Sequence, residues 1–146
     1  MRQALLTAVV DTNIWLDLLV FDDPSSRRLA DLLAGAKVTS LASPAMRAEL
    51  ADVLGRSRFG LDPGRQRALL TRYDDLVQIA AEPPDCRLAC RDPDDRKFLD
   101  LAVARRTDWL LSRDRALLAA RRPAARRFEL AIGTLADFYC WLDNGG

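Results

Sequence analysis

Residues 6–19 read LTAVVDTNIWLDLL, a mostly apolar run that reaches Asp11 and then continues with helical spacing from Asn13 to Leu19. The first part, from Leu6 to Val10, predicts a buried β-strand, and the second part predicts a helix that follows almost at once. A strand that leads directly into a helix is the repeating unit of a βαβ chain, in which helices cover a parallel sheet. These residues therefore indicate an α/β fold.

The rest of the chain repeats this alternation of short apolar runs and longer amphipathic runs. Further strands are predicted at residues 37–40, 77–81, 109–111 and 128–132, which gives five strands with the first. Further helices are predicted at residues 25–34, 44–54, 63–76, 93–105, 115–120 and 134–142, and several of them open with Pro at the first helical position. No repeat, low-complexity stretch or linker divides the chain, so we expect a single domain over residues 1–146.

The chain contains no histidine, which excludes Ser-His-Asp and Cys-His hydrolases and ribonucleases with a histidine pair. Any hydrolytic chemistry must come from carboxylates, Lys, Tyr or a metal held by oxygen ligands. Cys86, Cys90 and Cys140 lack the spacing of a zinc site, and we interpret them as idle thiols in a reducing compartment. The sequence shows no signal-peptide layout and no membrane-spanning run, so we expect a cytoplasmic protein.

The net charge of +1 says little about partners, but the arginines are unevenly distributed. Between Arg105 and Arg127 there are eight arginines against two aspartates. This segment is either a solvated surface stabilised by charges at helix ends or a surface that contacts phosphates, to which Arg is well suited. The composition therefore permits nucleic acid as a partner without requiring it.

Two acidic residues follow predicted strands. Asp11 closes the first strand, and Asp114 lies just past the fourth strand. Because ligands of open parallel sheets bind at the carboxyl ends of the strands, we expect both carboxylates to face one crevice. A buried acid after an apolar strand is costly unless it is hydrogen-bonded or bound to a metal. The structural alternative, in which each acid caps the following helix, fits the same pattern.

Further acids lie on predicted helices. Glu49 shares a helical stripe with apolar residues, so it either enters a pocket or stays at a solvated edge. The segment Asp92-Pro93-Asp94-Asp95 is typical of a helix N-terminus with Asp92 as the cap. Asp95 leads the apolar stripe of this helix and is expected to point inward, whereas Asp94 is expected to point toward solvent.

Four separated acids without histidine match a hard divalent cation, since Mg²⁺ and Mn²⁺ prefer oxygen ligands and keep several waters. Such an ion supplies hydroxide near neutral pH and neutralises the charge that develops during phosphodiester hydrolysis. Glycoside hydrolysis needs only two carboxylates and leaves the other acids unexplained. A phosphatase with an aspartyl nucleophile needs a second Asp two residues after the first, where this chain has Asn13.

Taken in order, these segments resemble the PIN-domain family, and in particular the VapC-like toxin components of bacterial toxin–antitoxin pairs. The likeness rests on Val9-Val10-Asp11-Thr12-Asn13-Ile14-Trp15, Ser43-Pro44 with Glu49-Leu50, Asp92-Pro93-Asp94-Asp95 with Phe98-Leu99, and Trp109-Leu110-Leu111-Ser112-Arg113-Asp114. It runs from about Thr7 to Phe138. Relatives in this branch often have Thr-Gly-Asp in the last motif, and the change to Arg113 puts a bulky cation beside the site. The resemblance implies a three-layer α/β/α sandwich with a central, mostly parallel five-stranded sheet.

The resemblance also implies an activity, that of a Mg²⁺- or Mn²⁺-dependent endoribonuclease. The catalytic and metal-binding acids of the family fall on Asp11, Glu49, Asp95 and Asp114. Asp92 and Asp94 compete with Asp95 for the third place. Asn13 and Ser112 fall on small polar positions that would orient the acids.

Arg113 and Arg115 lie near the expected crevice and are predicted to hold phosphates that flank the cleaved bond. The partners that the resemblance implies are an RNA substrate, a cognate antitoxin protein and a second copy of the chain in a homodimer. The alternative function is a PIN-like module with a weak or inactive site that acts through protein or RNA binding.

Two further positions in the sequence each have two interpretations. Trp15, Leu16 and Phe21 either pack in the core, which we expect for at least two of them, or line a groove for a dimer partner or antitoxin. Asp108 either belongs to the acidic pocket or lies on the surface.

Overall fold

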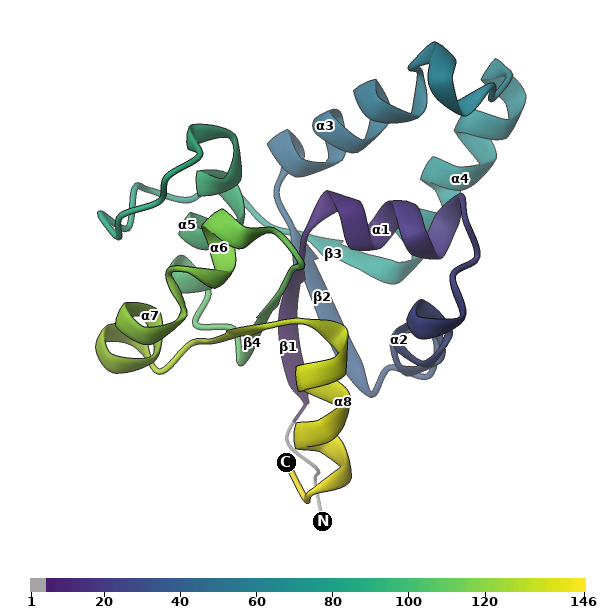
Figure 1. The fold of residues 1–146 in the computed structure, drawn as a ribbon. Helices are drawn as coiled ribbons and strands as arrows, with labels where there is room; N and C mark the ends of the chain where they lie inside the picture. Colours follow the sequence, from purple (N-terminus) through teal and green to yellow (C-terminus); the bar gives the residue numbers. More distant parts are fainter. Residues whose placement is uncertain (1–4) are drawn as a thin grey trace.

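The computed structural model describes residues 5–146 as a five-stranded sheet flanked by helices (Figure 1). The strands are β1 (Leu6–Val10), β2 (Val38–Ala42), β3 (Val77–Ile79), β4 (Trp109–Leu111) and β5 (Ala131–Gly133), and they lie in the order β3-β2-β1-β4-β5. All four strand pairings are parallel. The expected five-stranded sheet is confirmed, and across the described residues it is parallel throughout.

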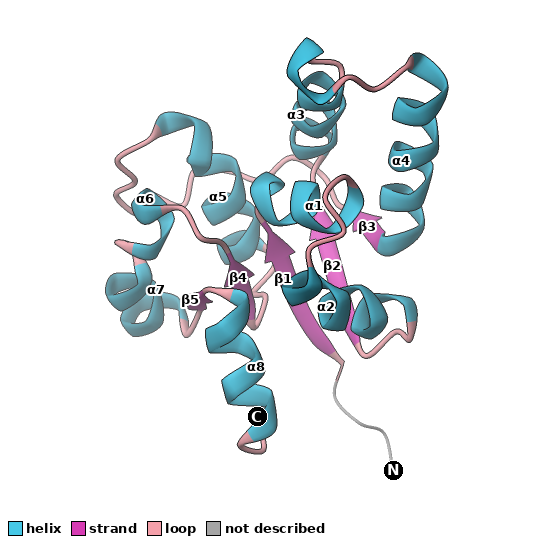
Figure 2. Ribbon diagram, turned by 45° about the vertical axis from the view of Figure 1, so that its right-hand side comes forward, coloured by secondary structure: helices cyan, strands magenta, loops and turns pink. Residues whose placement is uncertain are grey.

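Helices connect the strands and cover both faces of the sheet (Figure 2). They are α1 (Thr12–Leu19), α2 (Pro24–Ala34), α3 (Pro44–Leu54), α4 (Pro63–Leu76), α5 (Arg96–Ala104), α6 (Arg115–Leu118), α7 (Arg121–Phe128) and α8 (Leu135–Asp143), with 3₁₀ turns η1 (Ser57–Phe59) and η2 (Pro93–Asp95). The chain moves from β1 through β2 to β3 in one direction and then returns to β4. Because parallel crossovers are right-handed, α5, which packs on β1 and β4, covers the face opposite to α1 and α2. This arrangement is the expected α/β/α sandwich.

Short sequence signals determine where several helices begin. Asp23, Ser43 and Asp62 each precede a proline and accept a hydrogen bond from a backbone N–H of the first helical turn. Caps of this kind contribute about 1 kcal/mol each, and Pro at the next position already has a helical φ. The cap at Ser43 fixes the start of α3, which is the helix that carries Glu49.

The segment after β4 differs from the sequence expectation. The helix expected at 115–120 is the single turn of α6, and a second helix, α7, follows it. The strand expected at 128–132 is β5, since Phe128 ends α7 and Glu129 adopts a left-handed φ of 55°. Four arginines hide the helical pattern of α7, and Pro123 is tolerated because it lies in the first turn.

Asp108 does not belong to the acidic pocket. It directly precedes β4, at the amino end of the sheet, whereas Asp11 follows the carboxyl end of β1. One of its carboxylate oxygens accepts hydrogen bonds from the backbone N–H of Thr7 at 2.9 Å and from the Thr7 hydroxyl at 3.2 Å. Asp108 therefore ties the start of β4 to β1.

The hydrophobic core lies between the sheet and the helices. Val9 and Leu110, on neighbouring central strands, are completely buried. Trp15 and Leu16 are buried as well, whereas Phe21 lies beyond the end of α1 and is exposed. No helix within residues 5–146 is long and apolar enough to cross a membrane.

We predict that Leu110→Ala lowers the free energy of unfolding by about 2–5 kcal/mol, because it leaves a cavity in the middle of the sheet. Urea denaturation followed by circular dichroism measures this change. Ile79→Ala on the edge strand β3 is the matched control, since Ile79 is 47% exposed. The control should change the free energy by no more than about 0.5 kcal/mol. Equal losses from the two substitutions would contradict the burial pattern.

Candidate active site

The site begins where β1 and β4 end next to each other. Val10 pairs with Leu111, and the backbone N–H of Asp11 donates to the Leu111 carbonyl at 2.9 Å. The Ser112 hydroxyl donates to a carboxylate oxygen of Asp11 at 2.7 Å and accepts the backbone N–H of Asp114 at 2.9 Å. A single hydroxyl thus holds the acids of both strand ends in place.

The two strand-end acids differ in their relation to the following helices. Asp11 is buried and makes no side-chain hydrogen bond that caps α1, so the capping interpretation is wrong for this residue. Asp114 does cap α6, since its Oδ1 accepts the backbone N–H of Ala116 at 2.7 Å. Its other carboxylate oxygen, Oδ2, takes no part in this cap.

The turn η2 carries the third acid. Asp92 caps this turn by accepting the backbone N–H of Asp94 at 3.0 Å, as the sequence predicts. Asp94 is exposed, whereas Asp95 is only 8% exposed. The Asp95 Oδ2 atom is buried and has no hydrogen-bond partner within residues 5–146. Of the three competing acids, the structure therefore places Asp95 innermost.

Glu49 enters from α3 and is held by two contacts. Its Oε2 accepts the Thr12 hydroxyl at 2.6 Å, and its Oε1 pairs with the Lys97 ammonium at 3.1 Å. Glu49 is half-buried, so the structure shows neither a sealed pocket nor a fully solvated edge. These contacts join α1, α3 and α5 at the carboxyl edge of the sheet.

The acids repel one another when no cation lies between them. Burial raises the pKa of Asp11, the hydrogen bond from Ser112 lowers it, and the charges of Asp114 and Glu49 raise it again. The pKa of Asp95 rises to about 7, first because of burial and then because of the charges of Asp114 and Asp11. Close carboxylates cannot all ionise at low cost, so a proton or a cation must balance them.

A cavity of about 240 Å³ opens over these residues. Its charged and polar wall residues are Asp11, Thr12, Asn13, Glu49, Arg56, Arg58, Asp94 and Asp95. Asp114 does not line the cavity, although its charge acts on both Asp11 and Asp95. Acids at the base and arginines on the same wall suit a ligand with negative groups that are bridged by a cation.

These residues fit a hard divalent cation such as Mg²⁺ or Mn²⁺. The cavity wall offers carboxylate oxygens and no sulfur ligand. The buried Oδ2 of Asp95 has no hydrogen-bond partner within residues 5–146. Among residues 5–146, however, no three of the four acids bring oxygen atoms within 4.8 Å of one another. With this spacing, an ion would contact only some of the four carboxylates directly. It would bind the others through water molecules, which Mg²⁺ readily retains.

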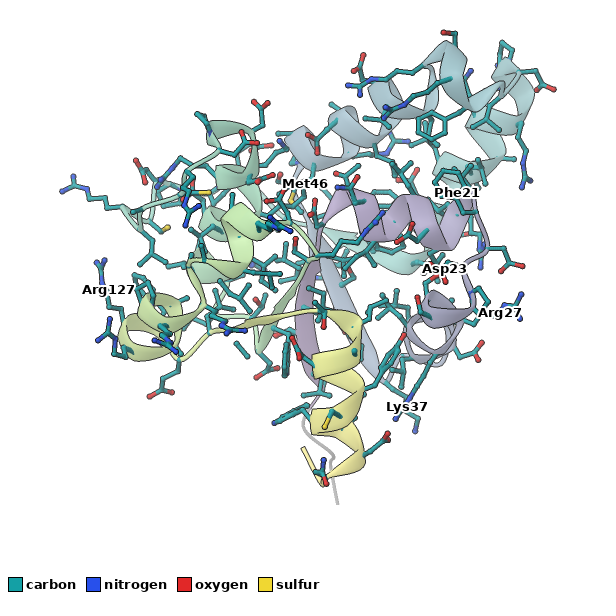
Figure 3. The ribbon with its side chains drawn as sticks, in the orientation of Figure 1. Phe21, Asp23, Arg27, Lys37, Met46 and Arg127 are labelled. Atoms are coloured by element: carbon teal, nitrogen blue, oxygen red, sulfur yellow. The ribbon has the colours of Figure 1, made fainter. Side chains whose placement is uncertain are left out.

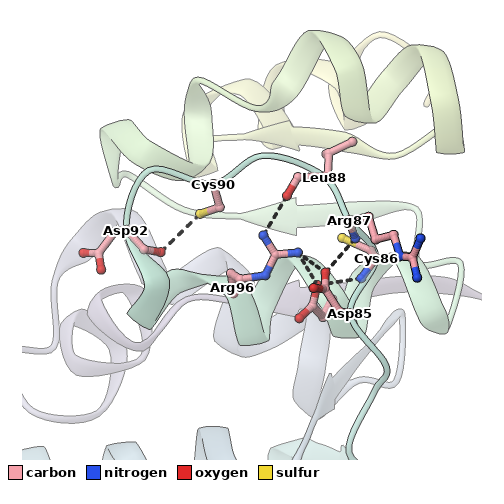
Figure 4. A network of polar contacts seen from close by, with 8 residues as sticks. Asp85, Cys86, Arg87, Leu88, Cys90, Asp92 and Arg96 are labelled. Atoms are coloured by element: carbon pink, nitrogen blue, oxygen red, sulfur yellow. Dashed lines mark hydrogen bonds and ion pairs between the residues drawn. The ribbon is translucent and has the colours of Figure 1, made fainter.

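A second group of donor atoms lies outside this cavity. Asp85, Cys86 and Asp100 each place one donor atom within 4.8 Å of the others. The Arg96 guanidinium already pairs with Asp85 (Figure 4). It also pairs with Asp100 at 3.4 Å. We therefore interpret this group as the anchor of the loop at residues 80–92. Burial raises the pKa of the Cys86 thiol, which agrees with an idle cysteine.

The other residues expected at the site are only partly brought together. Asn13 lines the cavity with an exposed side chain, and within residues 5–146 it makes no side-chain hydrogen bond to Asp11. Arg113 is 59% exposed and pairs with Asp17 at 3.2 Å beside the cavity. Arg115 is exposed and does not line the cavity.

Sequence reasoning missed four polar or charged residues that contact the site or line its cavity: Thr12, Arg56, Arg58 and Lys97. Thr12 follows Asp11 directly, and its hydroxyl was a visible signal. The run Arg56-Ser57-Arg58 lies in the connection between two helices, where basic residues are usually solvated. Nothing local in the sequence indicates that this connection folds back over the acids.

The sequence and the structure of this chain are similar to those of known proteins. The family model described as the PIN domain matches residues 7–116, a range that includes all four acids. Among solved structures, the chain is similar to the crystal structure of VapBC2 from Rickettsia felis bound to a DNA fragment from their promoter. The identity is 16% and the TM-score 0.62, over 87% of this chain and 97% of the other. Curated proteins gave no significant match to the chain.

We predict that Asp95→Asn stabilises the metal-free protein at pH 8, because the amide removes a buried charge that its neighbours repel. The melting temperature in EDTA should rise by about 2–4 °C, the shift that about 1 kcal/mol produces in a domain of this size. The difference should shrink as the pH falls below the folded pKa of about 7, and it should become small only near pH 4, where Asp95 is also partly protonated in the unfolded chain because its ordinary pKa is 3.8. Differential scanning fluorimetry measures the melting temperature at each pH.

Asp94→Asn is the matched control, since Asp94 lies in the same turn with an exposed side chain. It should leave the melting temperature almost unchanged. A lower melting temperature for Asp95→Asn in EDTA at pH 8 would show that the neighbouring acids do not repel the ionised Asp95 carboxylate.

Proposed function

The chain is a member of the PIN-domain family, and we propose that it is a metal-dependent endoribonuclease that hydrolyses phosphodiester bonds of RNA. The observation that carries this proposal is the buried carboxylate of Asp95, next to Asp11 and Asp114, with an oxygen that lacks a partner within residues 5–146. Like charges gathered in this way must be balanced by a proton or a cation, and arginines on the wall of the same cavity are suited to phosphates.

We assign the metal-binding role to Asp11, Asp95 and Asp114, directly or through water. Bound by these residues, a divalent ion would lower the pKa of water to near neutral pH and would offset the charge on the phosphate. Ser112 holds the Asp11 carboxylate in one orientation, which is the task of an outer hydrogen-bond partner. Glu49, with each of its oxygens in contact with a neighbour, completes the ligand set through water or positions the attacking water.

The arginines are assigned to the RNA backbone. Arg56 and Arg58 line the acidic cavity, and Arg113 lies beside it. A guanidinium binds two phosphate oxygens at once and so fixes the register of the strand over the acids. Arg115, which is outside the cavity, is assigned to a more distant phosphate.

We further propose that the protein is the toxin of a toxin–antitoxin pair, with a cognate antitoxin as its partner and a homodimer as its assembly. The support for this role is the similarity to the VapBC2 complex, together with the motifs that resemble VapC-like proteins. Expression of the chain alone should arrest growth, and co-expression of the neighbouring open reading frame should restore it. Growth arrest that no neighbouring gene relieves would contradict the toxin–antitoxin role without touching the nuclease.

We predict that Asp11→Asn reduces RNA cleavage at least about 100-fold, since the lost ligand removes several kcal/mol of transition-state stabilisation. Ser112→Ala should reduce cleavage about 10–100-fold, as expected for a residue that orients a metal ligand. The assay uses a fluorophore-quenched single-stranded RNA with Mg²⁺ or Mn²⁺, and EDTA as the metal-free control.

Asp85→Asn is the matched control for these variants, because Asp85 belongs to the donor group outside the cavity. It should cleave at the unchanged rate. Full activity of Asp11→Asn would contradict the site assignment. Absence of cleavage by the unchanged chain, with either ion and over a broad RNA pool, would favour the binding module instead.

We predict that saturating Mn²⁺ raises the melting temperature by about 5 °C at pH 8, since an ion that binds only the folded chain stabilises it. At pH 5.5 the rise should be much smaller, because the ion must displace a proton from Asp95, whose pKa is about 7. Thermal shift at the two pH values measures this difference. An equal rise at both would indicate that the ion binds elsewhere.

A further inference from the structure

We propose that the hollow next to the acidic cavity is a nucleobase subsite, in which one base of a single-stranded RNA stacks on Phe21 while Arg58 and Arg113 hold the adjoining phosphates. This inference rests on the proposed ribonuclease function and adds the path that the RNA follows away from the acids.

The hollow has a volume of about 390 Å³ and lies between the end of α1, the turn η1 and the loop after β4. It is lined by Asn13, Leu16, Phe21, Arg58, Phe59 and Arg113. Asn13, Leu16 and Arg58 line the acidic cavity as well, so the two depressions adjoin along these residues. A strand with a phosphate over the acids would therefore extend its next nucleotide into the hollow.

The aromatic part of the hollow is built for stacking on one side. The Phe21 ring lies 6.0 Å from the Phe59 ring with an interplanar angle of 47°, which is already a contact distance for two aromatic rings. A base therefore does not fit between the rings and must use the outer face of Phe21, which is 58% exposed. Every base has a π-face, so this contact tolerates any sequence.

The cationic part of the hollow flanks the rings. The Arg58 guanidinium lies over the Phe59 ring, 4.9 Å from its centre, and has no ion pair within residues 5–146. Arg113 pairs with Asp17 at 3.2 Å but keeps most of its side chain exposed. Each arginine thus retains N–H donors that point to no carboxylate, which is what a phosphate requires.

The chemistry of the hollow favours a polyanion over a protein partner. Stable protein interfaces bury about 800 Å² on each partner, with an apolar centre from which charge is depleted. Here two arginines lie directly beside two rings. Within residues 5–146 the other large exposed apolar side chains are Leu5, just before β1, and Ile79 on the edge strand β3, and neither lines the hollow. Alternating rings and arginines are typical of single-stranded nucleic-acid channels.

The test measures binding of a fluorescein-labelled single-stranded oligoribonucleotide by fluorescence anisotropy, in the Asp11→Asn background and with a gel check that the RNA stays intact. Phe21→Leu keeps apolar volume and removes the aromatic face, so it should weaken binding at least about five-fold. Phe21→Tyr keeps the aromatic face and should bind within about two-fold of the parent. A scan with single abasic positions in the RNA should find one position at which the parent loses affinity and Phe21→Leu does not.

Phe128→Leu is the matched control. Arg127 lies over the Phe128 ring at 5.1 Å, the same arrangement as Arg58 over Phe59, but on α7. Figure 3 shows Phe21 and Arg127 on opposite sides of the molecule. The control should change RNA binding by no more than about two-fold.

Equal binding by Phe21→Leu and its parent would overturn the subsite and leave the ribonuclease standing, and it is the result expected if Phe21 contacts a protein instead. No binding of any RNA by the parent would overturn the subsite, and the cleavage assay on the unchanged chain would then decide separately whether the ribonuclease function stands. Selective loss in Phe21→Leu, with retention in Phe21→Tyr and Phe128→Leu, establishes the subsite.

Discussion

The parallel pairing of β1 with β4 brings two strand ends together, and the arrangement of the acids depends on it. Val10 lies opposite Leu111, so the next residues, Asp11 and Ser112, meet across 101 positions of sequence in a hydrogen bond of 2.7 Å. Asp114 is held at the same place because its backbone N–H donates a hydrogen bond to the Ser112 hydroxyl. A slip of one residue in this pairing would turn these side chains to the other face of the sheet. The strand order also reverses here, between the β2–β3 half and the β4–β5 half, which is where open parallel sheets bind ligands.

The opposing constraint is charge. Folding brings Asp11, Asp95 and Asp114 together from three separate segments, and burial and mutual repulsion raise the pKa of Asp11 and Asp95. The folded chain is therefore destabilised by this cluster as the pH rises toward 7, unless a cation enters it. The neighbouring anchor at Arg96 is the opposite case, since there a guanidinium already balances Asp85 and Asp100. One acidic group contains its balancing guanidinium, whereas Asp11, Asp95 and Asp114 pair with no basic side chain within residues 5–146.

Sequence patterns predicted the parts of this structure that depend on local periodicity. The strand at Leu6–Val10, the helices opened by Pro44 and Pro63, and the inward position of Asp95 all follow from which residues share a face. The helix α7 was missed because its arginines leave little apolar signal.

The contacts that were missed join distant segments. Thr12 and Lys97 reach Glu49 from α1 and α5, and Phe59 reaches Phe21 from the turn after α3. Such contacts depend on how the helices pack, which no local pattern contains. The same is true of Arg58, whose position over the acids depends on the path of η1.

The proposed function requires that the acids at the carboxyl edge of the sheet form the metal centre. Electron paramagnetic resonance of Mn²⁺ tests this directly, since bound Mn²⁺ loses the sharp signal of the free ion. We predict that the unchanged chain and Asp85→Asn bind Mn²⁺ alike, and that Asp11→Asn loses this binding. Retention of Mn²⁺ by Asp11→Asn, with loss in Asp85→Asn, would place the metal in the other acidic group and contradict the proposed metal centre.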